Sequence, residues 1–159
     1  RLQGKTKRDQ QIYKTVFERK KIMRPIKEIV LHTTYTPEGR EHDVEDIRAW
    51  HKAKGWSDIG YHYLIKIDGT IEAGRPLDKI GAHAKGHNQG SIGICYVGGM
   101  SADHRSPLDT RTSNQKQAMQ QLVSALNVVF GGVKVLGHNE ISSKSCPCFD
   151  VGVEFSAYR

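Results

Sequence analysis

Ile26-Lys27-Glu28-Ile29-Val30-Leu31-His32 predicts the first core strand of the protein. Its apolar run, Ile29-Val30-Leu31, is short and continuous, which is typical of a buried strand. The run ends at His32. Because open α/β sheets usually place their sites at the carboxyl ends of strands, His32 is a candidate site residue.

A helix is predicted after the polar loop that follows this strand. Asp43 is suited to cap a helix that runs to about Lys54, with acidic residues in its first turn and lysines in its last. Such a helix would turn Val44, Ile47 and Trp50 toward the core.

A β-hairpin and a further strand are predicted next. Tyr61 to Ile67 alternates and is rich in aromatic and β-branched residues, Asp68-Gly69 supplies a two-residue turn, and Thr70 to Ala73 returns. Pro76 to Gly90 is rich in glycine, which indicates a loop, and Ser91 to Val97 is another buried strand.

The last part of the chain predicts a surface loop, a long helix and a final strand. Thr112 to Gln115 has a capping-box pattern that opens a helix to about Phe130. Its inner face is expected to carry Ala118, Leu122, Ala125 and Val129. Val133 to Leu136 is a strand that delivers His138 to a loop. This order predicts an α/β fold: a single domain with a central mixed β-sheet flanked by helices.

The composition limits the class of protein to which this chain can belong. A chain of 159 residues with 37% apolar and 26% charged residues fits one globular domain. No apolar run approaches the roughly 20 residues of a membrane helix, so no transmembrane segment is expected. No apolar segment follows the first basic residues, so no standard signal peptide is expected. Three cysteines cannot all pair, which favours synthesis in a reducing compartment.

The net charge of +7 is concentrated at one end of the chain. Residues 1–28 hold ten Lys/Arg and three Asp/Glu, and the remainder holds fourteen of each. We therefore expect a basic, partly helical extension over residues 1–25, followed by the main domain over residues 26–159. The apolar side chains at helical spacing in the extension, Ile12, Tyr13, Val16 and Phe17, favour packing on the domain. The alternative is a steering element for a polyanion: wall polymer, anionic lipid or nucleic acid.

His138 and Cys146 are candidate metal ligands at the other end of the chain. They lie eight positions apart in Gly137 to Pro147, and imidazole nitrogen and thiolate sulfur are both good zinc donors. With His32 they would make a three-ligand zinc site with one position left for water. Donor types alone leave ligation and an ordinary structural role as equal alternatives. Other histidines are interpreted as structural: His42, His51, His62 and His104.

A family resemblance rests on seven segments that follow one another along residues 26 to 151. They are Ile29-Val30-Leu31-His32-Thr33-Thr34, Trp50-His51-Lys52-Ala53-Lys54-Gly55-Trp56, Gly60-Tyr61-His62-Tyr63, Asp68-Gly69-Thr70-Ile71-Glu72-Ala73-Gly74-Arg75, His83-Ala84-Lys85-Gly86-His87-Asn88, Ser91-Ile92-Gly93-Ile94-Cys95, and Gly137-His138 through Asp150. These segments resemble the phage T7 lysozyme type of zinc-dependent N-acetylmuramoyl-L-alanine amidase, a family that includes the peptidoglycan recognition proteins.

The resemblance implies roles for five residues. His32, His138 and Cys146 match the family's zinc ligands, so residues 26–159 would form a zinc amidase domain. Tyr61 and Lys144 match its catalytic tyrosine and lysine. Without the resemblance, Tyr61 would be a strand tyrosine that packs its ring, and Lys144 a solvated loop cation.

Other residues near these positions have less specific predictions. His83 and Asn88 are expected to contact substrate from a loop bordering the groove. Glu140 is either a partner of a ligand or an ordinary exposed acid. Cys148 departs from the family, which often has a small hydroxyl residue there, and its thiol could compete for zinc or form a disulfide.

The implied function is zinc-dependent hydrolysis of the amide between N-acetylmuramic acid and L-alanine in peptidoglycan, by a phage or prophage endolysin. We expect a monomer, made in the cytoplasm of a phage-infected bacterium and acting on the cell wall. Residues 1–28 could bind an anionic envelope polymer, and nucleic acid is not an expected partner. Two alternatives are a non-catalytic peptidoglycan-binding module, disfavoured because Cys146 is present, and an amidase that also regulates a phage RNA polymerase.

Overall fold

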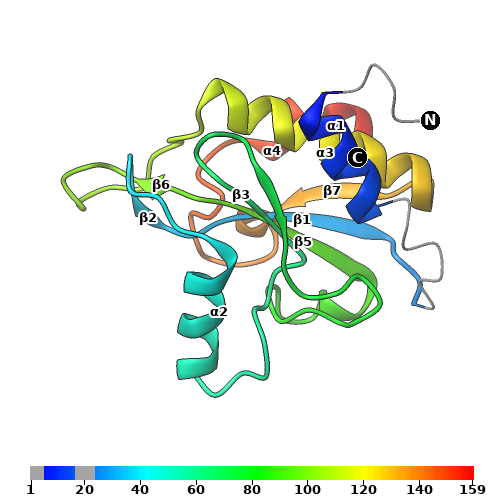
Figure 1. Ribbon diagram of the computed structural model, residues 1–159, viewed down its shortest axis with the longest axis horizontal. Helices are drawn as coiled ribbons and strands as arrows, with labels where there is room; N and C mark the ends of the chain where they lie inside the picture. Colours follow the sequence, from blue (N-terminus) through cyan, green and yellow to red (C-terminus); the bar gives the residue numbers. More distant parts are fainter. Residues whose placement is uncertain (1–5, 17–23) are drawn as a thin grey trace.

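The computed structural model describes residues 6–16 and 24–159, which form a five-stranded mixed sheet with helices on both faces (Figure 1). The strand order is β4-β3-β5-β1-β7. All neighbours are parallel except β3 and β4, which form the predicted antiparallel hairpin. The strands are β1 (Glu28–Thr33), β3 (Tyr63–Ile65), β4 (Ile71–Ala73), β5 (Ser91–Tyr96) and β7 (Lys134–Gly137).

The strand predicted from Ile26 to His32 lies inside the sheet, between β5 and β7. Ile29, Val30 and Leu31 have no exposed surface, because this strand is covered on both faces. Its continuous apolar run follows from that position. Alternate side chains then belong to two different cores.

Each face of the sheet packs against its own helices (Figure 1). Ile29 and Leu31 belong to the larger core, with α1 (Lys7–Val16), α3 (Ser113–Phe130) and α4 (Val151–Glu154). The smaller core contains Cys95 of β5 and the apolar residues of α2 (Val44–Ala53). His32 alternates with Leu31, so its side chain points toward the smaller core and α2.

The two predicted capped helices are present. Asp43 caps α2 and Thr112 caps α3, each through a capping box. Two positions predicted to face the core are wrong: the side chains of Trp50 and Val129 are 41% and 37% exposed. In α2 the buried neighbour of Trp50 is His51, whose Nδ1 accepts the Gly60 N–H.

The buried stripe of α3 is also wider than predicted. It contains Gln115, Ala118, Met119, Leu122, Val123 and Leu126. This stripe follows both the three- and four-residue spacings of a helix, so it drifts away from Val129 before the helix ends.

The described part of the N-terminal extension packs on the domain. Ile12 and Val16 of α1 are buried in the larger core, as their helical spacing predicts. The side chain of Gln11 accepts a hydrogen bond from the N–H of Ile71 in the edge strand β4. Phe17, also predicted to pack there, lies outside the described residues.

Short elements complete the fold. They are the strand pair β2 (Thr36–Pro37) and β6 (Gly99–Met100), and the 3-10 helices η1 (Asn88–Gly90), η2 (His138–Glu140) and η3 (Ser156–Tyr158). In the part of the chain that the structure describes, none of the helices combines the length and apolarity needed to cross a bilayer.

Candidate functional site

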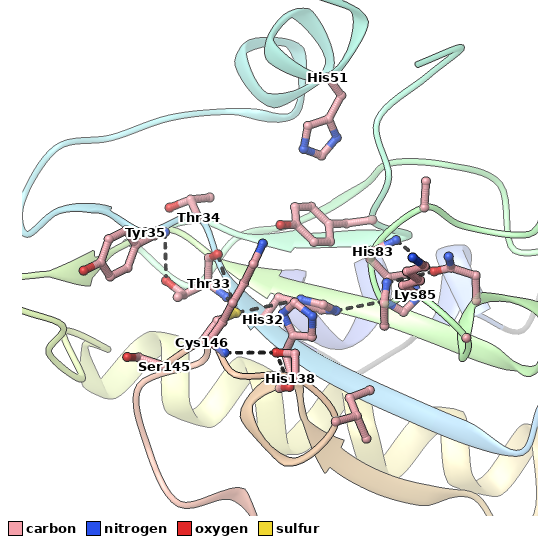
Figure 2. Close-up of a pocket in the computed structure, with 18 of the residues that line it drawn as sticks. His32, Thr33, Thr34, Tyr35, His51, His83, Lys85, His138, Ser145 and Cys146 are labelled. Carbon is pink, nitrogen blue, oxygen red and sulfur yellow. Dashed lines mark hydrogen bonds between the residues drawn. The ribbon is translucent and has the colours of Figure 1, made fainter. Parts of the chain in front are cut away.

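A pocket of about 980 Å³ opens at the carboxyl end of β1. Four segments line it: residues 32–35 after β1, residues 51–61 around the end of α2, residues 82–88, and residues 138–146 (Figure 2). Its size is within the usual range for small-ligand sites. The position agrees with the rule that predicted a site at the end of this strand.

The three predicted metal ligands meet at this pocket. Nitrogen or sulfur atoms of His32, His138 and Cys146 all lie within 4.8 Å of one another, a group that could hold a metal ion. The ring centroids of His32 and His138 are 4.6 Å apart, and Cys146 Sγ is 3.8 Å from His32 Nδ1. Figure 2 shows the three side chains converging from separate segments.

Strand register explains why the two histidines are neighbours. β1 and β7 are parallel, and Leu31 pairs with Gly137. The next residues, His32 within β1 and His138 directly after β7, therefore lie side by side at the same edge of the sheet. Two residues 106 positions apart become adjacent through this strand pairing.

The loop after β7 is anchored at both ends. At its start, the Glu140 carboxylate accepts the N–H of Gly137 at 2.6 Å and forms an ion pair with Arg159. At its end, the buried Tyr96 hydroxyl donates to the carbonyl of Pro147 at 2.7 Å. Glu140 therefore supports the backbone turn that begins at His138, and its role as a partner of a ligand stays a prediction.

Burial controls the charge of the three donors. It lowers the pKa of His32 well below its ordinary value, with further lowering by His83, His138 and Lys144. The pKa of His138 is lowered by burial and then by Lys144. Both imidazoles are therefore neutral near pH 7, with a lone pair available for a metal.

The thiol of Cys146 behaves differently. Burial raises its pKa to about 12, although the backbone N–H of Thr33 and the charge of Lys144 oppose the increase. Without a cation this sulfur is a neutral thiol near pH 7. A cation bound between the three donors would favour the thiolate.

Tyr61 and Lys144 line the same pocket. The Tyr61 ring centroid is 5.1 Å from that of His32, and its hydroxyl is hydrogen-bonded to Cys95. Burial, followed by Cys95 and Cys146, raises the pKa of Tyr61 well above its ordinary value, so the phenol keeps its proton. Lys144 is exposed, and its charge acts on both histidines.

His83 and Asn88 also line the pocket, but both make contacts within the protein. His83 is buried, with Nδ1 2.8 Å from His32 Nε2 and Nε2 3.1 Å from Ser91 Oγ. The side-chain oxygen of Asn88 accepts the backbone N–H groups of His83 and Ala84, both at 2.9 Å. Their predicted role as substrate contacts stays a prediction.

Two aromatic residues of the pocket were not predicted as site residues. Tyr35 has a φ of 54°, in the left-handed region, and its side chain is 44% exposed. Trp56 is 38% exposed at the end of α2. Trp56 had a usable signal, because it is a large aromatic residue directly after the glycine that ends the helix. The exposure of Tyr35 depends on tertiary structure.

Cys148 is not one of the three donors. It lines a separate hollow, and its thiol donates to the carbonyl of Gly99 at 3.3 Å. Within residues 6–16 and 24–159, the metal-capable group contains Cys146 but not Cys148.

Comparisons with known proteins agree with the fold and the site. The family model described as N-acetylmuramoyl-L-alanine amidase matches residues 22–149. The endolysin of Klebsiella phage KP32 is 41% identical over 124 residues, which cover 78% of this chain and 82% of that protein. The endolysin of Escherichia phage T7 is 42% identical over 124 residues, covering 77% and 81%.

Solved structures give the same result. The endolysin and N-acetylmuramoyl-L-alanine amidase LysCS of Clostridium intestinale has a TM-score of 0.70 and 27% identity, covering 84% of this chain and 85% of that chain. Drosophila PGRP-LB has a TM-score of 0.70 and 27% identity, covering 86% and 83%. The resemblance seen in the seven sequence segments is thus confirmed, and the chain belongs to the N-acetylmuramoyl-L-alanine amidase family.

Proposed function

We propose that this protein hydrolyses the amide bond between N-acetylmuramic acid and L-alanine in bacterial peptidoglycan, using zinc held by His32, His138 and Cys146. One observation carries the proposal: two imidazoles and a thiol lie within 4.8 Å of one another in a pocket of an amidase-family protein. This set has the composition of a catalytic zinc site, which uses three protein ligands and leaves one position open.

The residues present fit zinc. The neutral imidazoles offer lone pairs, and the N–H of Thr33 points at the sulfur of Cys146 over 3.2 Å. Nitrogen and sulfur donors favour zinc over magnesium or calcium, which prefer oxygen. When bound, zinc supplies a Lewis acid for the scissile carbonyl and makes water a usable nucleophile at neutral pH.

Lys144 and Tyr61 supply the protein's own part of the chemistry. The Lys144 ammonium, on the pocket rim, would stabilise the negative charge that develops on the substrate carbonyl oxygen. Burial favours the neutral phenol of Tyr61, which supports a role as a hydrogen-bond donor that orients the carbonyl or the attacking water. Both roles require the substrate amide to lie over His32 and His138.

Peptidoglycan is the proposed substrate, and the extension is a proposed contact with an anionic envelope polymer. α1 buries its apolar side against the domain and leaves Lys7 and Lys14 exposed. Much of the positive charge of residues 1–28 lies outside the described residues. The proposed setting is synthesis in the cytoplasm of a phage-infected bacterium and action on its cell wall, in line with the phage endolysins that the chain resembles.

Mass analysis of digested peptidoglycan tests the proposed reaction. An amidase releases stem peptides with a free N-terminal alanine and leaves the glycan strands uncut. Tight binding of wall fragments without any released peptide would favour the binding-module alternative. Sugar fragments as the sole product would contradict the amidase assignment.

A further inference from the structure

The side of His32 that faces away from Cys146 contacts a second histidine. Its Nδ1 is 3.8 Å from Cys146 Sγ, and its Nε2 is 2.8 Å from Nδ1 of His83 (Figure 2). We infer that His83 is a positioning residue that holds the His32 ring with Nδ1 presented to the metal. The inference rests on the proposed function, because it assumes that His32 is a ligand.

The hydrogen-bond pattern has one consistent arrangement with His32 Nδ1 as the metal donor. Between two ring nitrogens, one must donate and the other accept. If His32 Nδ1 offers its lone pair to the metal, the proton is on Nε2, which donates to His83 Nδ1. The remaining N–H of His83 is then on Nε2, where the fully buried Ser91 Oγ accepts it at 3.1 Å.

The fold leaves space for the His83 ring beside two glycines. A Cβ added at Gly93, inside β5, would lie 2.7 Å from ring carbons of His83, and one at Gly81 would lie 2.8 Å from it. Glycine weakens a strand interior, so it is typical of a close approach by another group. The two hydrogen bonds to Asn88 fix the backbone of the loop that carries this ring.

The relative orientation of the two rings supports the same role for His83. His83 meets His32 edge-on, at 89° and 4.9 Å between centroids. Partners of this kind fix the tautomer and the orientation of a ligating histidine, and their loss typically lowers metal affinity about 10–100-fold. The hydrogen bonds from Ser91 through His83 to His32 therefore support the ligating ring on the side away from Cys146.

Two amide substitutions separate this role from simple packing. His83→Asn places an oxygen near the position of Nδ1 and can still accept from His32. His83→Gln places its amide near Nε2, so it can keep the Ser91 contact but loses the one to His32. We expect His83→Gln to bind zinc about 10–100-fold more weakly in chelator competition, and His83→Asn to stay within a few-fold of the wild type.

The control is His87→Gln, in the same loop, where the ring pairs with Glu28 and not with the site. Its zinc affinity should equal that of the wild type. Nitrogen-15 spectra of the zinc-loaded protein should show His32 protonated at Nε2. Should His83→Gln fail to fold, Ser91→Ala, which removes only the distal acceptor, is expected to weaken zinc several-fold.

Three outcomes would count against this role. Equal losses in His83→Asn and His83→Gln would reduce His83 to a packing residue. If His83→Gln kept the zinc affinity of the wild type but raised the KM, His83 would be a substrate contact. Either result overturns the inference and leaves the proposed function intact. Wild-type protein that binds no zinc would overturn both.

Discussion

The backbone N–H of Thr33 donates to the sulfur of Cys146 over 3.2 Å, although the two residues are 113 positions apart. This contact joins the end of β1 to the loop after β7. It also opposes the effect of burial on the thiol, whose pKa is still about 12. The Thr33 N–H thus favours negative charge on the sulfur, and a cation bound between the three donors would favour it further.

Removing the ammonium of Lys144 should lower turnover without affecting the fold. The side chain is exposed, so Lys144→Met should leave the melting temperature unchanged. Loss of one group that stabilises an oxyanion typically costs about 10²–10³ in kcat. Steady-state kinetics on soluble peptidoglycan fragments measures this, with Lys134→Met, on the exposed side of β7, as the control. A raised KM with unchanged kcat would limit Lys144 to substrate binding.

The hydroxyl of Tyr61 can be removed while its ring is kept. Tyr61→Phe should lower kcat by about 10²–10³-fold, the usual effect of losing one hydrogen-bond donor directed at the reacting carbonyl. Zinc content should not change, since the three proposed ligands, His32, His138 and Cys146, are all kept. Turnover equal to that of the wild type would return Tyr61 to a packing role.

The buried Arg111 links the segment before α3 to α4 through an ion pair with Glu154, and its loss should lower the free energy of unfolding. Its side chain is 1% exposed, forms ion pairs with Asp109 and Glu154, and stacks on Phe149 at 3.4 Å. Removing one partner of a buried ion pair leaves the other charges unpaired, so Arg111→Met should cost about 3 kcal/mol in urea unfolding. Arg105→Met is the control, because its side chain is 83% exposed and its change should stay within about 0.5 kcal/mol.

The free energy of unfolding should fall as the pH drops, in part because of His62. Burial lowers the pKa of His62 to about 4, against the opposing hydrogen bond to the Lys79 carbonyl. A lowered folded-state pKa means that its stability is fully present above the unfolded value of 6.5 and is lost between pH 6.5 and about 4. The shift corresponds to a loss of about 3 kcal/mol over this window.

Comparing two proteins isolates this contribution. His62→Gln removes the titrating group, so its stability should depend less steeply on pH between 6.5 and 4 than that of the wild type. His104→Gln, at an exposed position, should keep the wild-type slope. Denaturant unfolding at several pH values measures all three, and identical slopes would show that His62 is not protonated on unfolding in this range.

Local patterns predicted the strand ending at His32, the hairpin and both capped helices. These features depend on neighbouring residues: a continuous apolar run, a two-residue turn and side chains that cap free N–H groups. The helix faces were predicted less well, because α2 buries His51, which accepts the N–H of Gly60 from another segment. Its neighbour Trp50 is exposed as a result.

Contacts between distant segments could not be predicted from residue patterns. The position of β1 between β5 and β7 depends on pairing over long sequence separations, and it brings His138 to His32. The sequence predicted His83 only as a substrate contact in a glycine-rich loop. Its contacts with His32 and Ser91 depend on the space left by Gly93 in a neighbouring strand.

Zinc content, measured together with amidase activity, tests the central claim most directly. Purified wild-type protein should hold an equimolar amount of zinc, lose activity with a chelator and regain it when zinc is added. Cys146→Ser should hold little zinc and release no stem peptide, while Cys148→Ser, whose thiol donates to the Gly99 carbonyl and is not one of the three donors, should resemble the wild type in both respects. Wild-type protein that is free of metal and still releases stem peptides would contradict the account.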